Sequence, residues 1–390
     1  ITVVRTGQLT QAATVDFATA DNDPGHLLPC SQVSGNASSR CDYEATSGTL
    51  QFAPGDSFKT FTVLVNDDSF VEGTEMAKLI LSNPTGDSVL GPQSTSTLEI
   101  DDNDATTPTT NPIDDAQFFV AQHYRDFLSR EPDAPGLQFW TQGIISCGSD
   151  ANCVAVKRVN TSAAFFLSIE FQNTGYFVYR VYKTAFGDAD GRTTLGDAPG
   201  ASHNIKVPFV RYEDFMPDTQ RIGEGVVVGQ GLWQQQLETN KQAFALDFVS
   251  RADASSGGQS FQAAFPSGTS AAGIVNTLFK NAGVAPTDAE RQALLDELAP
   301  NPDSPSLRAD VLRKIAEHPA LVRQESNRAF VLMQYFGYLR RNPDGGPDTD
   351  FTGYDFWLSK LEQFGGDYHK AEMVRAFIES AEYRARFGQR

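Results

Sequence analysis

The hydrophobic pattern of this chain changes its period at a short stretch rich in Thr and Pro, residues 104–112, and this change limits the fold. Before the stretch, residues 14–19 and 58–65 alternate apolar and polar side chains, and turn-forming clusters at 54–56 and 83–86 separate such runs. After it, apolar side chains recur with helical spacing. We therefore predict a multidomain β + α protein, in which an antiparallel β-sandwich is followed by an all-α module.

The domain boundaries follow from the same change. Residues 1–104 are predicted to form the sandwich, residues 105–114 a stiff, extended linker, and residues 115–390 the helical module. A length of 390 residues also favours more than one hydrophobic core. Because Ile1 already lies inside a predicted strand, we expect the first strand of the sandwich to be missing from the chain.

The helical module is predicted to begin near residue 118, with Asp114 and Asp115 as candidate caps. Gly-, Ser- and Pro-rich segments at 186–204 and 252–270 are predicted to be connectors. The later helices are predicted at 161–185, 232–250, 271–282, 287–298, 306–341, 352–363 and 368–387.

Two segments of the helical module share one residue pattern, which predicts an internal repeat. The pattern is Tyr-x-x-aromatic-Leu-x-Arg-x-Pro-Asp, then Gly and an aromatic-Trp pair, at 124–140 and again at 335–357. Related copies span about 118–172 and 329–387, and each ends in Ser-x-Glu-aromatic. The aromatic residues of this pattern are interpreted as core residues.

The four cysteines form two local pairs, Cys30 with Cys41 and Cys147 with Cys153. Neither pair has C-x-x-C spacing and the five histidines are scattered, so zinc binding and thiol redox chemistry are disfavoured. We predict two disulfides and a compartment outside the cytoplasm. The chain has no run of about eighteen apolar residues, and membrane insertion is not expected.

The net charge of −18 disfavours nucleic acid as a partner, because a negative surface repels phosphate. Residues 1–104 carry fifteen acidic and four basic side chains. This acidity fits either a solvated face or divalent-cation sites, and clustering at predicted strand ends favours Ca²⁺, which prefers oxygen ligands. The clustered acids are Asp42, Asp67, Asp68, Glu72, Glu75, Asp101, Asp102 and Asp104.

Known catalytic patterns are missing from the sequence, and we predict that the protein is not an enzyme. It contains no G-x-S-x-G motif and no phosphate-binding Gly-rich loop followed by Lys-Ser/Thr. Glycan hydrolysis by a pair of carboxylates far apart in sequence is an alternative that the sequence leaves open.

Six separated motifs occur in order at 16–21, 42–43, 48–55, 66–75, 81–83 and 100–104. Together they resemble the Calx-beta domain, an immunoglobulin-like calcium-binding sandwich. This resemblance implies calcium ligands at Asp42, Asp67, Asp68, Glu72, Asp102 and Asp104. The chain departs from the family in lacking the first strand and in carrying a longer loop, 21–42, with a cysteine pair. A degenerate sandwich without bound metal is the alternative.

Residues 115–390 resemble a bacterial domain of unknown function that is similar to phycobilisome linker repeats, whose relatives act through protein–protein contacts. The resemblances imply an exported, cell-surface bacterial protein with a structural, scaffolding or adhesive function. Because the exposed edge of an incomplete sandwich can accept a strand, self-assembly into fibres is one hypothesis. Expected partners are other copies of the chain, other surface proteins or glycans. The alternative function is a calcium-dependent glycan- or protein-binding module of a larger secreted protein.

Overall fold

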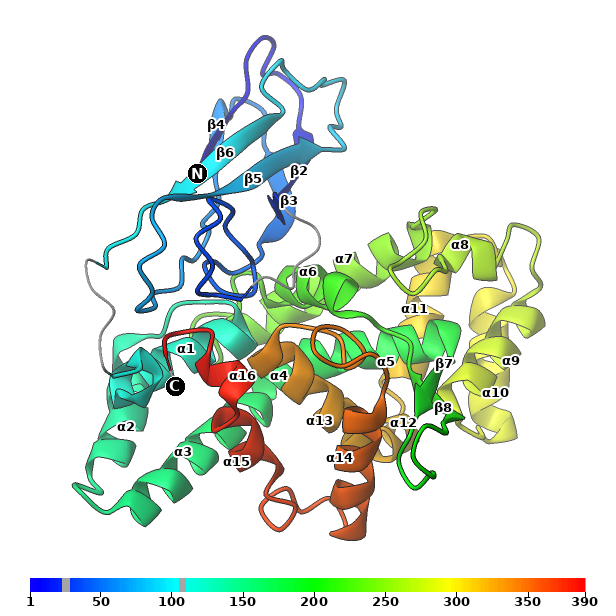
Figure 1. Cartoon of the computed structure of the whole chain (residues 1–390). Coiled ribbons are helices and arrows are strands. Elements are labelled where there is room, and N and C mark those ends of the chain that lie inside the picture. Colours follow the sequence, from blue (N-terminus) through cyan, green and yellow to red (C-terminus); the bar gives the residue numbers. More distant parts are fainter. Residues whose placement is uncertain (23–28, 105–109, 390) are drawn as a thin grey trace. The chain divides into compact units, whose positions relative to one another are not determined.

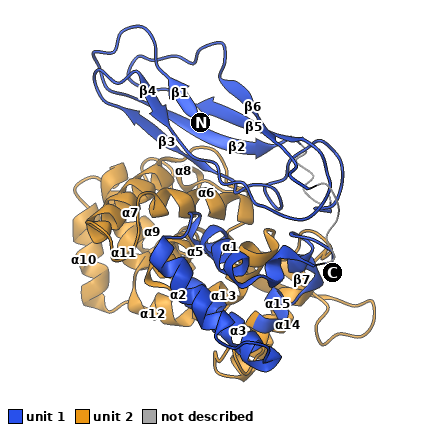
Figure 2. Ribbon diagram, turned by 90° about the vertical axis from the view of Figure 1, so that its left-hand side faces the viewer, with its two compact units in different colours: residues 1–165, 375–390 blue, residues 166–374 orange. Residues whose placement is uncertain are grey.

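The computed structural model describes residues 1–22, 29–104 and 110–389 of the chain (Figure 1). These residues form two compact units, which Figure 2 shows in different colours. Unit 1 consists of Ile1–Phe165 and Arg375–Arg390, and unit 2 of Phe166–Val374. The predicted boundary near residue 110 therefore lies inside unit 1.

The first part of unit 1 is the predicted antiparallel β-sandwich. Its strands are β1 (Thr2–Val4), β2 (Ala13–Asp21), β3 (Ser47–Phe52), β4 (Phe58–Thr60), β5 (Glu75–Ser82) and β6 (Thr95–Ile100). One sheet has the order β3-β2-β5-β6 and the other pairs β1 with β4 (Figure 1). Inward-facing side chains from both sheets form the core, where the rings of Phe17 and Phe61 stack with centroids 4.1 Å apart. The predicted strand at 58–65 is shorter in the structure, because only its first three residues form a ladder, with β1.

Unit 1 continues with the 3₁₀ helix η1 (Pro112–Asp114), α1 (Ala116–Leu128), α2 (Ala134–Ile145), most of α3 (Ala151–Phe166) and α16 (Ala381–Arg384). The carboxylate of Asp115 accepts hydrogen bonds from the N–H groups of Gln117 and Phe118, so this residue caps α1 as predicted.

The predicted linker falls partly outside the described residues, at 105–109. In the described remainder, Asn111 is extended, but Pro112–Asp114 form the 3₁₀ helix η1. The Asn111 side chain accepts the N–H of Ile113 and donates to the carbonyls of Arg384 and Gly388, which holds this segment against the end of the chain within unit 1.

Unit 2 is mainly helical, and α5 is buried along nearly its whole length. Its helices are α4 (Ile169–Asn173), α5 (Gly175–Phe186), α6 (Tyr212–Gly223), α7 (Trp233–Ser250), α8 (Phe261–Ala264), α9 (Ala271–Ala282), α10 (Asp288–Leu298), α11 (Pro305–Ala316), α12 (Pro319–Gln324), α13 (Ser326–Gln334), the π-helix η2 (Tyr335–Leu339) and α14 (Thr352–Gln363). The helix α15 (Met373–Ile378) begins in unit 2 and continues into unit 1. Within the described parts of the chain, no helix is long and apolar enough to cross a membrane.

Three predicted helices are interrupted in the structure, at side-chain caps or at proline. The helix predicted at 306–341 is broken by His318 and Pro319, because proline lacks the N–H that a continuous helix would use. The helix predicted at 161–185 is broken at Ser168, and the one at 368–387 at Ser380. Each serine hydroxyl accepts a backbone N–H and starts a new helix.

Unit 2 also contains a two-stranded hairpin, part of which lies in the connector predicted at 186–204. Strand β7 (Asp188–Thr193) pairs antiparallel with β8 (His203–Pro208). A Cβ at Gly191 would lie 2.6 Å from Val207 and 2.8 Å from Phe351, so glycine permits close packing here. The composition of β7 gives little indication of a strand, because Asp and Gly disfavour strands and the hairpin depends on this packing.

The two predicted repeat copies share a contact between a tyrosine and a glycine. The Tyr124 hydroxyl lies where a Cβ of Gly136 would be, and the Tyr335 hydroxyl lies 2.6 Å from the Cβ position of Gly353. This similarity supports the repeat, which stays a prediction.

We predict that Gly136→Ala destabilises the protein by about 1–3 kcal/mol, because the added methyl group overlaps the Tyr124 hydroxyl. Gly143→Ala is the matched control in the same helix, since nothing lies within 4 Å of its Cβ position. The control is expected to leave stability unchanged or raise it slightly. Urea denaturation of both variants measures the difference, and equal stabilities would contradict the packing described here.

Candidate metal centre

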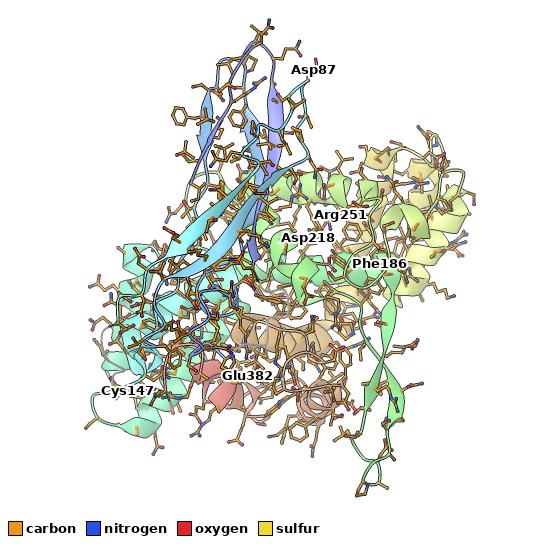
Figure 3. The ribbon with its side chains drawn as sticks, turned by 45° about the horizontal axis from the view of Figure 1, so that its top comes forward. Asp87, Cys147, Phe186, Asp218, Arg251 and Glu382 are labelled. Atoms are coloured by element: carbon orange, nitrogen blue, oxygen red, sulfur yellow. A yellow bond between two sulfur atoms is a disulfide. The ribbon has the colours of Figure 1, made fainter. Side chains whose placement is uncertain are left out.

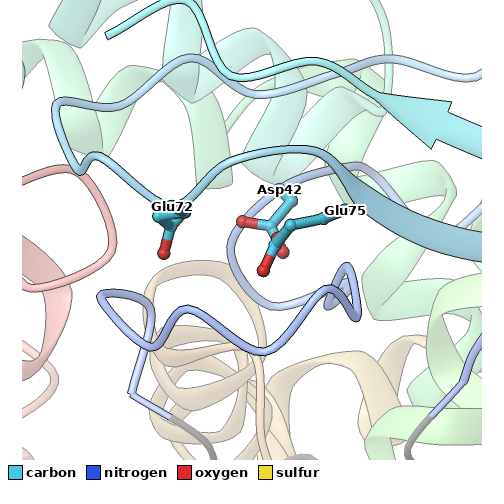
Figure 4. A group of neighbouring side chains, drawn as sticks. All are labelled: Asp42, Glu72 and Glu75. Carbon is cyan, nitrogen blue, oxygen red and sulfur yellow. The ribbon is translucent and has the colours of Figure 1, made fainter. Parts of the chain in front are cut away.

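Three acidic side chains meet at one end of the sandwich. Asp42 follows the first disulfide, Glu72 lies in the loop before β5, and Glu75 is the first residue of β5. One carboxylate oxygen from each lies within 4.8 Å of those from the other two, and among the described residues this is the candidate metal-binding group (Figure 4). Asp42 and Glu75 are buried and Glu72 is half-buried.

A tight turn fixes the position of Asp42. Its Oδ2 accepts the Ser38 N–H at 2.6 Å, and its own N–H donates to the Ser38 carbonyl at 2.8 Å. Its carbonyl accepts the Asn66 N–H at 2.8 Å, and the Asn66 side chain donates to the carbonyl of Cys41. The carboxylate is therefore held in place before any ligand binds.

Strand geometry fixes the position of Glu75. Side chains alternate between the two faces of a strand, and Glu75 shares its face with the buried residues Ala77 and Leu79. An acidic residue at a core-facing position is unfavourable without a compensating partner, which makes Glu75 a candidate ligand. The predicted ligand set did not include Glu75. Its position among the core-facing residues of an alternating strand could have identified it from the sequence.

The carboxylates at this end of the sandwich have strongly raised pKa values. Burial raises the pKa of Asp42 to about 6 and that of Asp68 to about 7. Burial raises the pKa of Glu75 to about 8 and that of Glu72 to about 9, and the neighbouring carboxylates add to both shifts. Without a cation Glu72 and Glu75 retain protons at neutral pH, because burial disfavours their charged forms and the neighbouring negative charges add to this effect.

Two of the six predicted ligands lie in the three-carboxylate group, and the other four lie outside it. Asp42 and Glu72 belong to the three-carboxylate group, and Asp68 is near enough for its charge to act on Glu72 and Glu75. Asp67 accepts a hydrogen bond from the Asn103 side chain, and burial raises the pKa of Asp104.

Asp102 accepts several backbone hydrogen bonds. Its Oδ2 accepts the N–H groups of Glu72 and Gly73, both at 2.8 Å, and its Oδ1 accepts the Asp104 N–H at 2.8 Å. These bonds lower its pKa. Asp102 therefore holds the Glu72 loop in position. A ligand role for Asp67, Asp102 and Asp104 stays a prediction.

A small cavity of about 20 Å³ adjoins the three carboxylates. It is also lined by Asp21 and by residues of the loop that leads from Pro29 to Cys41. This volume is comparable to the space that one water molecule needs, and a single metal ion is of similar size. The carboxylate oxygens are hard donors, and both nearby cysteine sulfurs are in a disulfide, so the donor set fits Ca²⁺ better than zinc or copper.

Both predicted disulfides are present in the structure. Cys30 is bonded to Cys41 and Cys147 to Cys153, each with a Cα–Cα distance of 5.6 Å. The first disulfide closes the loop beside the candidate metal centre. The second joins Cys147, which lies just after α2 and is labelled in Figure 3, to Cys153 in the first turn of α3.

Several solved structures are similar to the first part of the chain. The structure of the calcium binding domain CBD12 of CALX1.1 is 28% identical, covering 26% of this chain and 38% of that chain, with a TM-score of 0.22. The apo-form Calx CBD1 domain is 29% identical, covering 26% of this chain and 80% of that one, with a TM-score of 0.23. CBD12 from CALX1.2 is 29% identical over 26% of this chain and 37% of that one, with a TM-score of 0.23. The chain thus spans less than half of the two CBD12 chains.

A comparison with curated proteins finds no match to the chain. The match to a protein-family model ends at residue 104, so the resemblance of residues 115–390 to linker-type repeats stays a prediction. The family model covers residues 1–104, which include all strands of the sandwich and all three carboxylates of the candidate metal centre. The first 104 residues of the chain are therefore a Calx-beta domain.

Proposed function

We propose that the Calx-beta domain of this chain binds Ca²⁺ through Asp42, Glu72 and Glu75, with Asp68 close by. The observation that carries the proposal is the meeting of three carboxylate oxygens beside an ion-sized cavity. CBD12 of CALX1.1, to which the first part of the chain is 28% identical, is a calcium binding domain, which agrees with this donor set. A divalent cation would replace the protons that Glu72 and Glu75 otherwise retain at neutral pH, so its binding releases protons.

Calcium has a mechanical role in this proposal. The three carboxylates come from the turn after Cys41, from the loop before β5 and from β5 itself. A cation held by all three would tie these segments together and stiffen this end of the sandwich. We therefore propose an exported structural, scaffolding or adhesive cell-surface protein of bacterial origin, without catalytic activity. The two disulfides support a location outside the cytoplasm.

The helical part is proposed to provide contacts with other proteins. The shared Tyr–Gly contact and the serine caps that start α4 and α16 support two copies of one helix-loop-helix repeat. Such repeats are similar to linker domains that work by protein–protein contact. This analogy supports a scaffolding function and no particular partner.

We also propose that copies of the chain assemble by adding a strand to a free edge of the sandwich. Among the described strands, β1 pairs only with β4, and β6 only with β5, so each sheet has free edges. Val4 of β1 and Phe58 of β4 are 66% and 60% exposed. An open groove of about 500 Å³ lies beside β1 and is lined partly by Val89 and Leu90. A strand from another copy of the chain could pair with this edge and cover its apolar side chains.

We predict that Asp42→Asn combined with Glu75→Gln weakens Ca²⁺ binding by about tenfold or more, because fewer charged oxygens remain to hold the ion. Asp87→Asn, in the exposed loop at the tip of the sandwich (Figure 3), is the matched control, since it removes a charge from the same domain. Isothermal titration calorimetry measures both affinities. Equal affinities for the double variant and the unaltered protein would exclude this site.

We predict that the calcium-free protein loses stability as the pH rises. A carboxyl group whose pKa is raised by folding favours the folded state at low pH, and this contribution is lost as pH rises through the folded pKa. Each contribution begins to fall near the usual carboxyl pKa of about 4 and is gone above the folded pKa, which is about 6 for Asp42 and about 9 for Glu72, so the loss extends from about pH 4 to about pH 9. Thermal unfolding measured with and without Ca²⁺ should show a gap that widens with pH. A calcium-free melting temperature that stays constant or rises from pH 6 to 9 would contradict the electrostatic account.

Electron microscopy of the purified protein tests self-assembly. If strand addition occurs, filaments form, and Val4→Lys reduces them because a charge is placed at the exposed edge. Val33→Lys, at another exposed apolar position, is the control and should leave filaments intact. Dispersed particles under all conditions would refute fibre formation and favour a calcium-dependent glycan- or protein-binding module of a larger secreted protein.

A further inference from the structure

We propose that the loop closed by the Cys30–Cys41 disulfide forms one wall of the metal-binding site, and that this disulfide determines the affinity of the site for a divalent cation. The inference rests on the proposed calcium binding and adds a positioning element to it. The usual Calx-beta pattern does not include this cysteine-bearing loop, so the family match alone does not lead to it.

The disulfide-closed loop forms part of the wall of the cation cavity. Cys30, Gln32, Ser34 and Asn36 line the same cavity as the three carboxylates. In Figure 4 the carboxylate groups of Asp42, Glu72 and Glu75 point to the same side, toward a blue segment of the chain that runs beside them. A cation bound to these oxygens would therefore be covered by the loop and shielded from bulk water.

The second half of the loop is anchored to the sandwich by backbone hydrogen bonds. The Ala37 N–H donates to the Met76 carbonyl at 3.0 Å, and the Met76 N–H donates to the Gly35 carbonyl at 3.1 Å. The Ser39 N–H donates to Asp21 Oδ1 at 2.9 Å. Ala37 is buried against Tyr43 and Ala77. This half of the loop would keep its position without the disulfide.

The first half, residues 29–33, has no such anchors among the described residues. Its hydrogen bond there is local, from the Gln32 N–H to the Pro29 carbonyl. Most of its residues are exposed, and Val33 is 70% exposed. The covalent bond to the buried Cys41 is therefore what holds this half at the cavity. Because Cys41 directly precedes Asp42, the disulfide also connects residues 29–33 to one of the proposed metal-binding residues.

Breaking the bond should release one wall of the cavity while leaving the three acids in place. A released segment has many more conformations available, and it must give these up again each time a cation binds. The expected result is weaker binding, mainly through faster loss of the ion. The second disulfide offers an internal comparison, because neither Cys147 nor Cys153 lines the cavity.

The first experiment compares Ca²⁺ affinity in two paired variants by calorimetry, with circular dichroism to confirm folding. Cys30→Ser with Cys41→Ser should bind Ca²⁺ about tenfold more weakly or worse than the unaltered protein. Cys147→Ser with Cys153→Ser loses a disulfide as well and should keep its affinity. Equal affinities in all three proteins would overturn the inference and leave calcium binding intact. No heat of binding in the unaltered protein would instead overturn the proposed function.

A second measurement uses the unaltered protein and does not depend on the variants folding. If closing the loop favours the cation, the bound cation must equally favour the closed loop. Dithiothreitol reduces a protein disulfide to two thiols and is itself oxidised to its cyclic disulfide. Saturating Ca²⁺ should slow the reduction of Cys30–Cys41 severalfold and leave that of Cys147–Cys153 unchanged, as measured by alkylation and mass spectrometry. Calcium binding with no change in either rate would contradict the inference.

Discussion

The burial of several neighbouring carboxylates at one end of the sandwich, where they also repel one another, is the constraint on which the proposed function depends. Strand alternation places Glu75 on the core face of β5, and a hydrogen-bonded turn brings Asp42 beside it. Both groups prefer to be neutral there, and burial raises both pKa values. A fold that keeps such acids together must either protonate them or neutralise them with a cation. The hard oxygen donors and the ion-sized cavity favour the cation.

Ion pairs and hydrogen bonds elsewhere in unit 1 help to hold the turn that carries Asp42. Arg386 is fully buried, forms an ion pair with Asp126 of α1 and donates to the carbonyl of Arg40 at 2.9 Å. Arg40 itself pairs with Glu382 of α16, which Figure 3 labels. The charge of Arg386 also opposes the rise in the pKa of Asp42. The end of the chain thus holds the turn that carries Asp42, which explains why Arg375–Arg390 belongs to the same compact unit as the sandwich.

The sequence predicted those features that depend on local pattern. Alternation predicted the sandwich, and the helices at 232–250, 271–282 and 352–363 are found within a residue of their predicted ends. Resemblance to the Calx-beta family predicted Asp42 and Glu72, which the structure brings together. The break at Pro319 could also have been predicted, since proline commonly starts a helix.

Other features depend on contacts between distant residues and gave no local signal. The contact between Arg386 and Arg40 joins positions 346 residues apart, and the β7–β8 hairpin depends on packing against Phe351. Glu75 differs from these features, because its place on the core face of β5 follows from strand alternation, but the ligands that the Calx-beta resemblance implies do not include it. The most direct test of the central claim is a crystal structure of the protein grown with Ca²⁺. We predict an ion peak between Asp42, Glu72 and Glu75, with oxygen distances of about 2.3–2.6 Å. A calcium-loaded crystal with no peak there, or with a peak only between Asp67 and Asp104, would contradict it.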